Sequence, residues 1–350
     1  MEEKLMKEGP DIRSMTISEL ENLSVSYGEN RYRGAQLFSW FHEKKVDDFD
    51  QMTNISKAFR EKLMKEQSLM PLETEKVLKS ELDGTRKYLF RLFDNNIIES
   101  VLMKYKHGNS VCISSQVGCR MGCRFCASTI DGLERNLYPS EMLSQVYNIE
   151  KDLGERVSNI VVMGSGEPLD NFDNLVRFIE LVSHPKGINI SQRNITVSTC
   201  GIVPKIYELA DLGLQITLAI SLHASTQEKR REIMPVANKY GIEELLSACR
   251  YYFDKTGRRL TFEYSLIKGV NDSDEDAENL CRILKGLNAH INLIPVNPIE
   301  ERQYRQSEKE AVISFKNKLE KNGRNVTIRR EMGRDINGAC GQLRRTYKKE

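Results

Sequence analysis

Apolar residues recur at helical spacing in the first part of this 350-residue chain. The apolar positions lie three and four residues apart, and turn or cap residues separate one stretch from the next. The stretches are 18–28, 34–45 and 54–67. This pattern predicts a small helical domain at the N-terminus.

The pattern changes to a period of two at 85–93 and again at 97–105. Asp94, Asn95 and Asn96 lie between these two stretches. Alternation on both sides of a short polar segment predicts a β-hairpin with a turn of three residues or slightly more. We expect this hairpin to link the helical domain to the rest of the chain.

From about Ser110 onward, short apolar runs rich in β-branched residues alternate with amphipathic stretches. The runs lie at 111–115, 159–164, 194–199, 216–222, 259–267 and 290–297, and a closing strand is predicted at 325–331. About six βα units predict a parallel sheet, in a full or partial (β/α) barrel or in a doubly wound fold. In all of these folds the active site lies at the C-terminal ends of the strands.

The composition, with 39% hydrophobic and 29% charged residues, is that of a globular protein with a substantial core. No apolar run approaches the roughly 18 residues of a membrane span, and the first ten residues lack the apolar segment of a secretion signal. We therefore expect a cytoplasmic protein without a membrane partner. The formal net charge of +2 neither supports nor excludes RNA binding, which would depend on local basic patches.

The eight cysteines are not expected to form structural disulfides, because thiols stay reduced in the cytosol. Three of them, Cys119, Cys123 and Cys126, form a Cys-x-x-x-Cys-x-x-Cys motif directly after the first predicted barrel strand. Dense thiolates bind zinc or an iron–sulfur cluster. Structural zinc usually takes four ligands, whereas three cysteines leave one iron of a [4Fe-4S] cluster open. We therefore favour a cluster whose open iron binds S-adenosylmethionine (SAM) for radical chemistry. Phe125 would shield the cluster, contact adenine or simply pack in the core.

With these motifs, the chain resembles the RlmN family of dual-specificity 23S rRNA and tRNA adenine C2-methyltransferases, within the radical SAM superfamily. The resemblance covers nearly the whole chain. Two departures, Ser165 where relatives often carry Met and Gly338 where they usually carry Ala, remove no functional side chain. The segments that carry the resemblance are CISSQVGCRMGCRFCAS (112–128), GSGEPLDN (164–171), the region of Ser198, SLHAS (221–225), LIPVNP (293–298) and DINGACGQL (335–343).

The resemblance implies a partial (β/α)6 TIM-like radical SAM barrel. It would have an N-terminal helical RNA-binding domain (1–78), a linking β-hairpin (79–108) and a radical SAM core (109–350) that ends in a methyl-carrier loop. The implied cofactors are a [4Fe-4S] cluster on Cys119, Cys123 and Cys126 and two molecules of SAM per turnover. The implied SAM-binding residues are Gly166, Glu167, Ser198, Ser221, Leu222, His223 and Asn297. Taken singly, Ser198 and Asn297 would be interpreted as cap or turn residues and His223 as a structural histidine.

The resemblance also implies three catalytic residues. Cys340 would carry the methyl group as S-methylcysteine, Cys112 would attack the Cys340 sulfur to release the methylated RNA as a transient disulfide forms, and Glu99 would accept the C2 proton. Alone, Glu99 would be interpreted as a solvated strand residue and Cys340 as an incidental thiol. We expect Cys200, Cys249 and Cys281 to pack in the core.

The implied partners are 23S rRNA and tRNA, a reducing flavodoxin- or ferredoxin-like electron donor, and a thioredoxin-like reductant for the disulfide. A monomer is expected. Basic side chains near the motifs are candidate phosphate contacts, although a charge run is as often a solvated face. They are Arg31, Arg33, Arg120, Arg124, Arg329, Arg330, Arg334, Arg344, Arg345, Lys348 and Lys349.

Three other functions remain open on the sequence. The nearest is a Cfr-type sister enzyme, which uses the same cysteines to methylate C8 of the same adenine. A radical SAM enzyme that acts on a peptide or small molecule is disfavoured by the pair Cys112 and Cys340. A zinc-binding RNA module would be colourless and would not turn over SAM.

Overall fold

The computed structural model describes residues 11–297, 299 and 301–336. Its first part contains the predicted helices, α1 (Ile17–Ser26), α2 (Tyr32–His42) and α3 (Lys57–Glu66). Thr16 and Glu19 cap α1 reciprocally, each side chain accepting the other's backbone N–H. At Gly34 a Cβ would lie 2.3 Å from the backbone nitrogen of Glu21, so only glycine lets α2 approach α1 so closely.

A run of seven parallel strands forms the centre of the molecule and confirms the predicted βα units. The strands lie side by side in chain order: β4 (Gly108–Ile113), β7 (Val157–Val162), β8 (Ile195–Thr199), β9 (Thr217–Ser221), β10 (Leu260–Leu266), β11 (Ala289–Pro295) and β12 (Asn325–Ile328). The strand order does not reverse, whereas in a doubly wound sheet it reverses at one point. Within the described residues β12 is an edge strand, so the barrel is partial.

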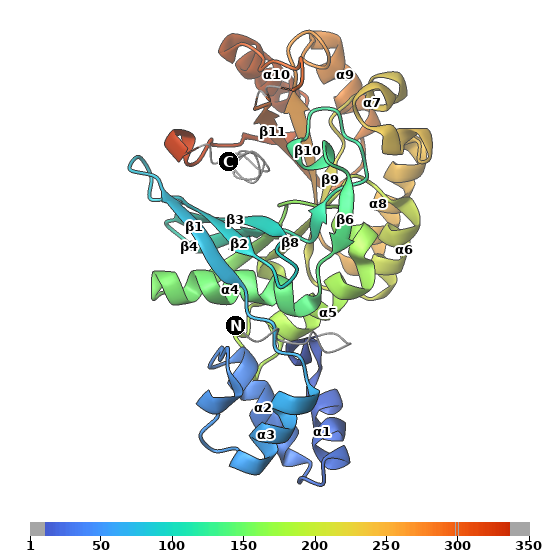
Figure 1. Ribbon diagram of the computed structural model, residues 1–350. Helices are drawn as coiled ribbons and strands as arrows, with labels where there is room; N and C mark the ends of the chain where they lie inside the picture. The colour runs from blue at the N-terminus through green and yellow to red at the C-terminus, as the bar shows by residue number, and fades with distance from the viewer. Residues whose placement is uncertain (1–10, 298, 300, 337–350) are drawn as a thin grey trace.

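Helices cover the outer side of this curved sheet (Figure 1). Along β10, Phe262, Tyr264 and Leu266 are fully buried, and the Tyr264 ring packs against Phe315. Glu263 and the other alternate positions therefore face the inner side of the barrel. The helices are α4 (Pro139–Leu153), α5 (Phe172–Ser183), α6 (Val203–Asp211), α7 (Gln227–Ile233), α8 (Ile242–Thr256), α9 (Asp274–Ile283) and α10 (Lys309–Lys321).

The predicted hairpin is present as β2 (Arg86–Arg91) and β3 (Ile97–Tyr105). It does more than link two parts of the chain, because β3 pairs antiparallel with β4 and so extends the barrel sheet. A further strand, β1 (Glu73–Lys79), pairs with β2 at the sheet edge. The sequence pattern does not predict β1, because its residues are mostly charged and at least partly exposed, as is common on an edge strand.

The N-terminal helices pack on α4 and α5 below the sheet (Figure 1). His42 of α2 is fully buried there, and its Nδ1 lies 2.8 Å from the hydroxyl of Tyr147 on α4. Burial lowers the pKa of His42 to about 3, so this contact is made by a neutral imidazole. In the described part of the chain, no helix combines the length and the apolar character that crossing a membrane requires.

Candidate active site

A cavity of about 280 Å³ opens where the parallel strands end. This volume is near the lower end of the roughly 300–1,000 Å³ of ligand pockets. The cavity is bordered by the ends of β4, β7, β10, β11 and β12 and by one face of β3. The predicted site residues that line it are Glu99, Cys112, Cys126 and Asn297, with Phe125, Arg329 and Arg330 beside them.

The loop that carries the three clustered cysteines, residues 119–126, is called here the thiol loop. It follows β5 (Gln116–Gly118), which forms a small separate sheet with β6 (Leu133–Asn136). Backbone contacts fix the loop. Gly118 has a φ of +79°, a Cβ there would lie 2.0 Å from the Gly132 carbonyl oxygen, and that oxygen accepts the Cys119 N–H at 2.8 Å. The Thr129 hydroxyl donates to the Cys123 and Cys126 carbonyls, both at 3.0 Å.

The thiols of the loop are largely shielded from water, and burial raises the pKa of each one. For Cys119 the pKa rises to about 12. The thiols also lie close enough together for charge on one to raise the pKa of its neighbours. Within the described residues, no three His, Cys, Asp or Glu side chains converge as ligands of a single metal ion. A site of several soft thiols spread over one loop suits a cluster, whose cysteines bind separate irons, better than one zinc ion.

Gly166 and Glu167 follow β7 and lie against the strand that leads into the thiol loop. Gly166 has a φ of +108°, and a Cβ there would lie 2.8 Å from the backbone nitrogen of Gln116. The buried Glu167 carboxylate accepts the N–H of Leu169 at 3.0 Å and of Cys200 at 2.7 Å. Burial raises its pKa. Glu167 therefore joins the ends of β7 and β8, and its predicted contact with SAM stays a prediction.

The remaining predicted SAM ligands lie at the C-terminal ends of β8 and β9 or directly after β9 and β11. The hydroxyls of Ser198 and Ser221 face one another on adjacent strands at 3.4 Å. His223 has a φ of +53°, and its Nδ1 accepts the Ser265 N–H at 2.9 Å, which places the hydrogen of the neutral ring on Nε2. Burial lowers the pKa of His223 to about 3. Leu222 is fully buried and Asn297 is exposed at the cavity.

The residues Lys87, Glu99 and Cys112 form what we call the strand wall. Glu99 on β3 and Cys112 on β4 line the cavity, and the Lys87 ammonium lies 3.1 Å from the Glu99 carboxylate. All three side chains are buried, with Lys87 fully so. Burial raises the pKa of Cys112, while the positive charge of Arg329 opposes that rise. Glu99 is thus not a solvated strand residue, and the third predicted catalytic residue, Cys340, lies outside the described residues.

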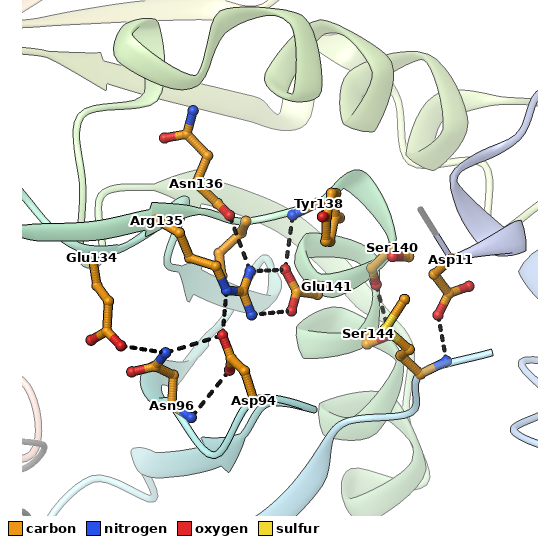
Figure 2. A network of polar contacts seen from close by, with 12 residues as sticks. Asp11, Asp94, Asn96, Glu134, Arg135, Asn136, Tyr138, Ser140, Glu141 and Ser144 are labelled. Atoms are coloured by element: carbon orange, nitrogen blue, oxygen red, sulfur yellow. Dashed lines mark hydrogen bonds and ion pairs between the residues drawn. The ribbon is translucent and has the colours of Figure 1, made fainter. Parts of the chain in front are cut away.

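A polar network holds the hairpin turn beside this wall, as Figure 2 shows. The Arg135 guanidinium donates to Asp94 at 2.5 Å and to Glu141 at 2.8 Å. Asn96 donates to Glu134 at 2.8 Å. The turn that precedes Glu99 is therefore attached to β6 and to the first turn of α4, and the thiol loop runs between β5 and β6.

Two of the candidate phosphate contacts that the structure describes line the cavity. Arg329 and Arg330 line the cavity, whereas Arg31 is paired with Glu21 at 2.7 Å and Arg120 with Asp170. The candidates Arg344, Arg345, Lys348 and Lys349 lie outside the described residues. Cys249 and Cys281 pack in the main core, which confirms that expectation. Cys200 is also packed, but in a second apolar cluster that contains Cys123.

The sequence reasoning missed three charged side chains. Glu263 is the one charged residue of β10, which was a usable signal, whereas Lys87 shares β2 with Arg86 and Arg91 and does not stand out in the sequence. The Glu263 carboxylate accepts the Asn292 amide at 3.0 Å inside the barrel, and burial raises its pKa. Arg230 is fully buried beside the exposed Arg231, and nothing in the sequence separates the two.

Comparison with known proteins agrees with this geometry over nearly the whole chain. Residues 113–281 match the model of the radical SAM superfamily, and residues 11–69 match that of the ribosomal RNA large subunit methyltransferase N-terminal domain. A crystal structure of a radical SAM methyltransferase from Sphaerobacter thermophilus superposes with a TM-score of 0.91 and 42% identity, covering 95% of this chain and 99% of that one.

Curated relatives show the same correspondence. The chain is 65% identical over 337 residues to the probable dual-specificity RNA methyltransferase RlmN of Lachnospira eligens, covering 96% of each. It is 60% identical to that of Lachnoclostridium phytofermentans, covering 96% of this chain and 95% of the relative.

The fold, the thiol loop and these likenesses define a radical SAM enzyme, a SAM-dependent RNA methyltransferase that uses a [4Fe-4S] cluster and SAM. Within that class, the chain belongs to the RlmN family.

Proposed function

We propose that this enzyme methylates C2 of an adenine in 23S rRNA and in tRNA by way of S-methylated Cys340. The observation that carries the proposal is that Glu99, Cys112 and Cys126 border one cavity although they come from β3, β4 and the thiol loop. A proton acceptor, a resolving thiol and a cluster ligand thereby face a single space. The curated relatives named as dual-specificity RNA methyltransferases support two RNA substrates.

Cys119, Cys123 and Cys126 would hold the cluster. The residues that would hold SAM are Gly166, Glu167, Ser198, Ser221, Leu222, His223 and Asn297. When bound, these cofactors supply the carbon radical that removes a hydrogen atom from an S-methyl group, a chemistry that belongs to the cofactors. The electron would come from a flavodoxin- or ferredoxin-like donor.

The side chains of the strand wall would complete the reaction. Glu99 takes the proton from C2. The unpaired electron that radical addition leaves on the adduct would return to the cluster. The Cys112 thiolate then attacks the Cys340 sulfur, so a disulfide forms while the bond between that sulfur and the transferred carbon breaks. The electron pair of that bond stays on the carbon, which takes up a proton to become the methyl group. A thioredoxin-like dithiol then supplies two electrons that reopen the disulfide. Because Cys112 is buried, bulk water is kept from this thiol during the reaction.

The RNA would reach the cavity as an extruded adenine, because C2 is inaccessible within a stacked helix. Arg329 and Arg330 at the cavity would contact its phosphates. The N-terminal helices would provide a second RNA surface, in keeping with the ribosomal RNA methyltransferase model that matches them.

The test is anaerobic reconstitution with iron and sulfide, followed by incubation with SAM, reductant and either an rRNA fragment or tRNA. Nucleoside mass spectrometry then identifies the product. We expect 2-methyladenosine from both RNAs, its loss in Cys340→Ala, and its retention in Cys249→Ala, which removes a buried thiol that does not line the cavity. The appearance of 8-methyladenosine would assign the enzyme to the sister family, and a colourless, inactive zinc protein would refute the proposal.

A further inference from the structure

Arg230 on α7 is a fully buried cation without a carboxylate partner among the described residues. Its guanidinium donates to four backbone carbonyls instead: Cys200 at 2.6 Å, Leu222 at 3.2 Å, and Ser221 and Tyr240 at 3.5 Å each. Carbonyl dipoles satisfy its hydrogens but do not neutralise its charge. A buried charge is costly unless an opposite charge lies close by.

The groups near Arg230 that can become anionic are thiols and the buried Glu167 carboxylate, which accepts the N–H of Cys200 at 2.7 Å. Burial lowers the pKa of Arg230, and the thiols of Cys200, Cys123 and Cys249 oppose that effect. Arg230 donates to the Cys200 carbonyl at 2.6 Å, and Cys200 packs in one apolar cluster with Cys123 of the thiol loop. The guanidinium therefore lies within electrostatic range of the predicted cluster ligands.

The surrounding backbone places Arg230 behind the thiol loop and away from water. Its two closest carbonyls belong to the residues that directly follow β8 and β9. The carbonyl of Ile233, at the end of α7, accepts the Arg124 N–H at 2.9 Å and so attaches this helix to the loop. Cys123, Cys200 and Met234 form an apolar cluster at the same place. In such a dry environment a charge acts strongly over several ångströms.

We propose that Arg230 is the buried counter-ion of the iron–sulfur cluster and sets its reduction potential. This inference rests on the proposed role of Cys119, Cys123 and Cys126. Three thiolates outweigh the charge of the oxidised iron–sulfur core, and the electron that reduces it adds one more negative charge. A fixed cation nearby stabilises both states and the reduced one more, because the reduced state carries more negative charge. Arg230 thus acts through the cluster as a positioning residue and contacts no substrate.

The test compares Arg230→Gln, which removes the charge but keeps amide donors, with Arg230→Lys, which keeps the charge but loses the planar fork. Arg324→Met is the matched control, because Arg324 also donates to two carbonyls, of Cys281 and Leu284, away from the thiol loop. Three quantities are measured on reconstituted protein: the reduction potential, the rate at which an iron chelator strips the cluster, and the gain in unfolding free energy on loading.

We expect Arg230→Gln to shift the reduction equilibrium at least tenfold toward the oxidised cluster, which is 59 mV for one electron. Its cluster should also be stripped about tenfold faster, and loading should stabilise it less than wild type. Arg324→Met should keep the wild-type potential, and so should Arg230→Lys at a pH low enough to keep the lysine protonated. A wild-type potential and stripping rate in Arg230→Gln would overturn the inference, whereas a wild-type protein that takes up no cluster would overturn the proposed function itself.

If Arg230→Gln does not fold, the pH dependence of the reduction potential in Arg230→Lys tests the inference by itself. A buried lysine can lose its proton as the pH rises, whereas an arginine cannot. The potential of Arg230→Lys should therefore fall more steeply with pH than that of wild type. Equal slopes would overturn the inference.

Discussion

The thiol loop and the strand wall meet at one cavity but are built in different ways. The loop is held through main-chain atoms: glycines with positive φ, N–H groups that donate to carbonyls, and the Thr129 hydroxyl, which donates to two carbonyls of the loop. Without a bound metal its thiols are neutral, because burial raises the pKa of each. Such a loop gains its charge only when a metal deprotonates the thiols.

The strand wall is held by side chains on paired strands. Val101 of β3 faces Cys112 across the ladder, and Glu99 lies two residues before Val101. The Lys87–Glu99 pair places both charges inside the protein without any cofactor. One side of the cavity is therefore built to receive a cofactor, while the other already carries the groups with which the chain itself would act on RNA.

The largest expected effect is that of Cys112→Ala on the strand wall. Loss of the resolving thiol should reduce released methylated RNA at least about a thousandfold, as expected when a nucleophile is removed. RNA should instead stay covalently attached to Cys340, which a denaturing gel can detect. Cys281→Ala, another buried thiol, should behave as wild type. Normal release from Cys112→Ala would show that the wall does not resolve the intermediate.

Glu99→Gln should lower the rate by roughly 10²–10⁴, the usual contribution of a general base. RNA binding and cluster loading should stay unchanged, because the amide keeps the shape of the carboxylate. Glu150→Gln is the matched control: Glu150 is also buried and paired with a lysine, Lys45 at 2.5 Å, but it does not line the cavity. Equal rate losses in the two variants would mean that Glu99 acts only through stability.

Lys87→Met tests whether the wall depends on its internal charge pair. Removing one partner of a buried pair leaves the other uncompensated and should lower the free energy of unfolding by about 3–5 kcal/mol. The double variant Lys87→Met/Glu99→Gln should recover part of this stability in urea denaturation while remaining inactive. Without such recovery, Lys87 and Glu99 would not be energetically coupled.

The release step should also depend on pH. Because burial raises the pKa of Cys112, less of this thiol is ionised near neutral pH than in a free cysteine. Below that pKa the thiolate fraction grows with pH, so release should accelerate by up to about tenfold per pH unit. Single-turnover release measured at increasing pH checks this, and a rate that falls with pH would contradict it.

The sequence predicted the βα units, the hairpin, the N-terminal helices and the thiol motif, because each depends on periodicity or spacing along the chain. It did not predict β1, a charged edge strand. It also did not distinguish Arg230 from Arg231 or show that Glu99 is buried beside Lys87. These features depend on which strands pair and how α7 is turned toward the barrel, and such contacts between distant segments leave no local pattern.

The smallest expected effect concerns the backbone of the loop side. Gly166→Ala should destabilise the protein, because alanine pays about 1–2 kcal/mol for a left-handed backbone and its Cβ would meet Gln116 at 2.6 Å. Gly154→Ala, at a φ of +68° with open space around it, isolates the backbone contribution. The difference between the two variants in urea denaturation measures the close packing that places Gly166 beside β5. If Gly166→Ala lowers the free energy of unfolding no more than Gly154→Ala does, close packing at Gly166 does not hold the loop side of the cavity. SAM affinity should then be unaffected as well.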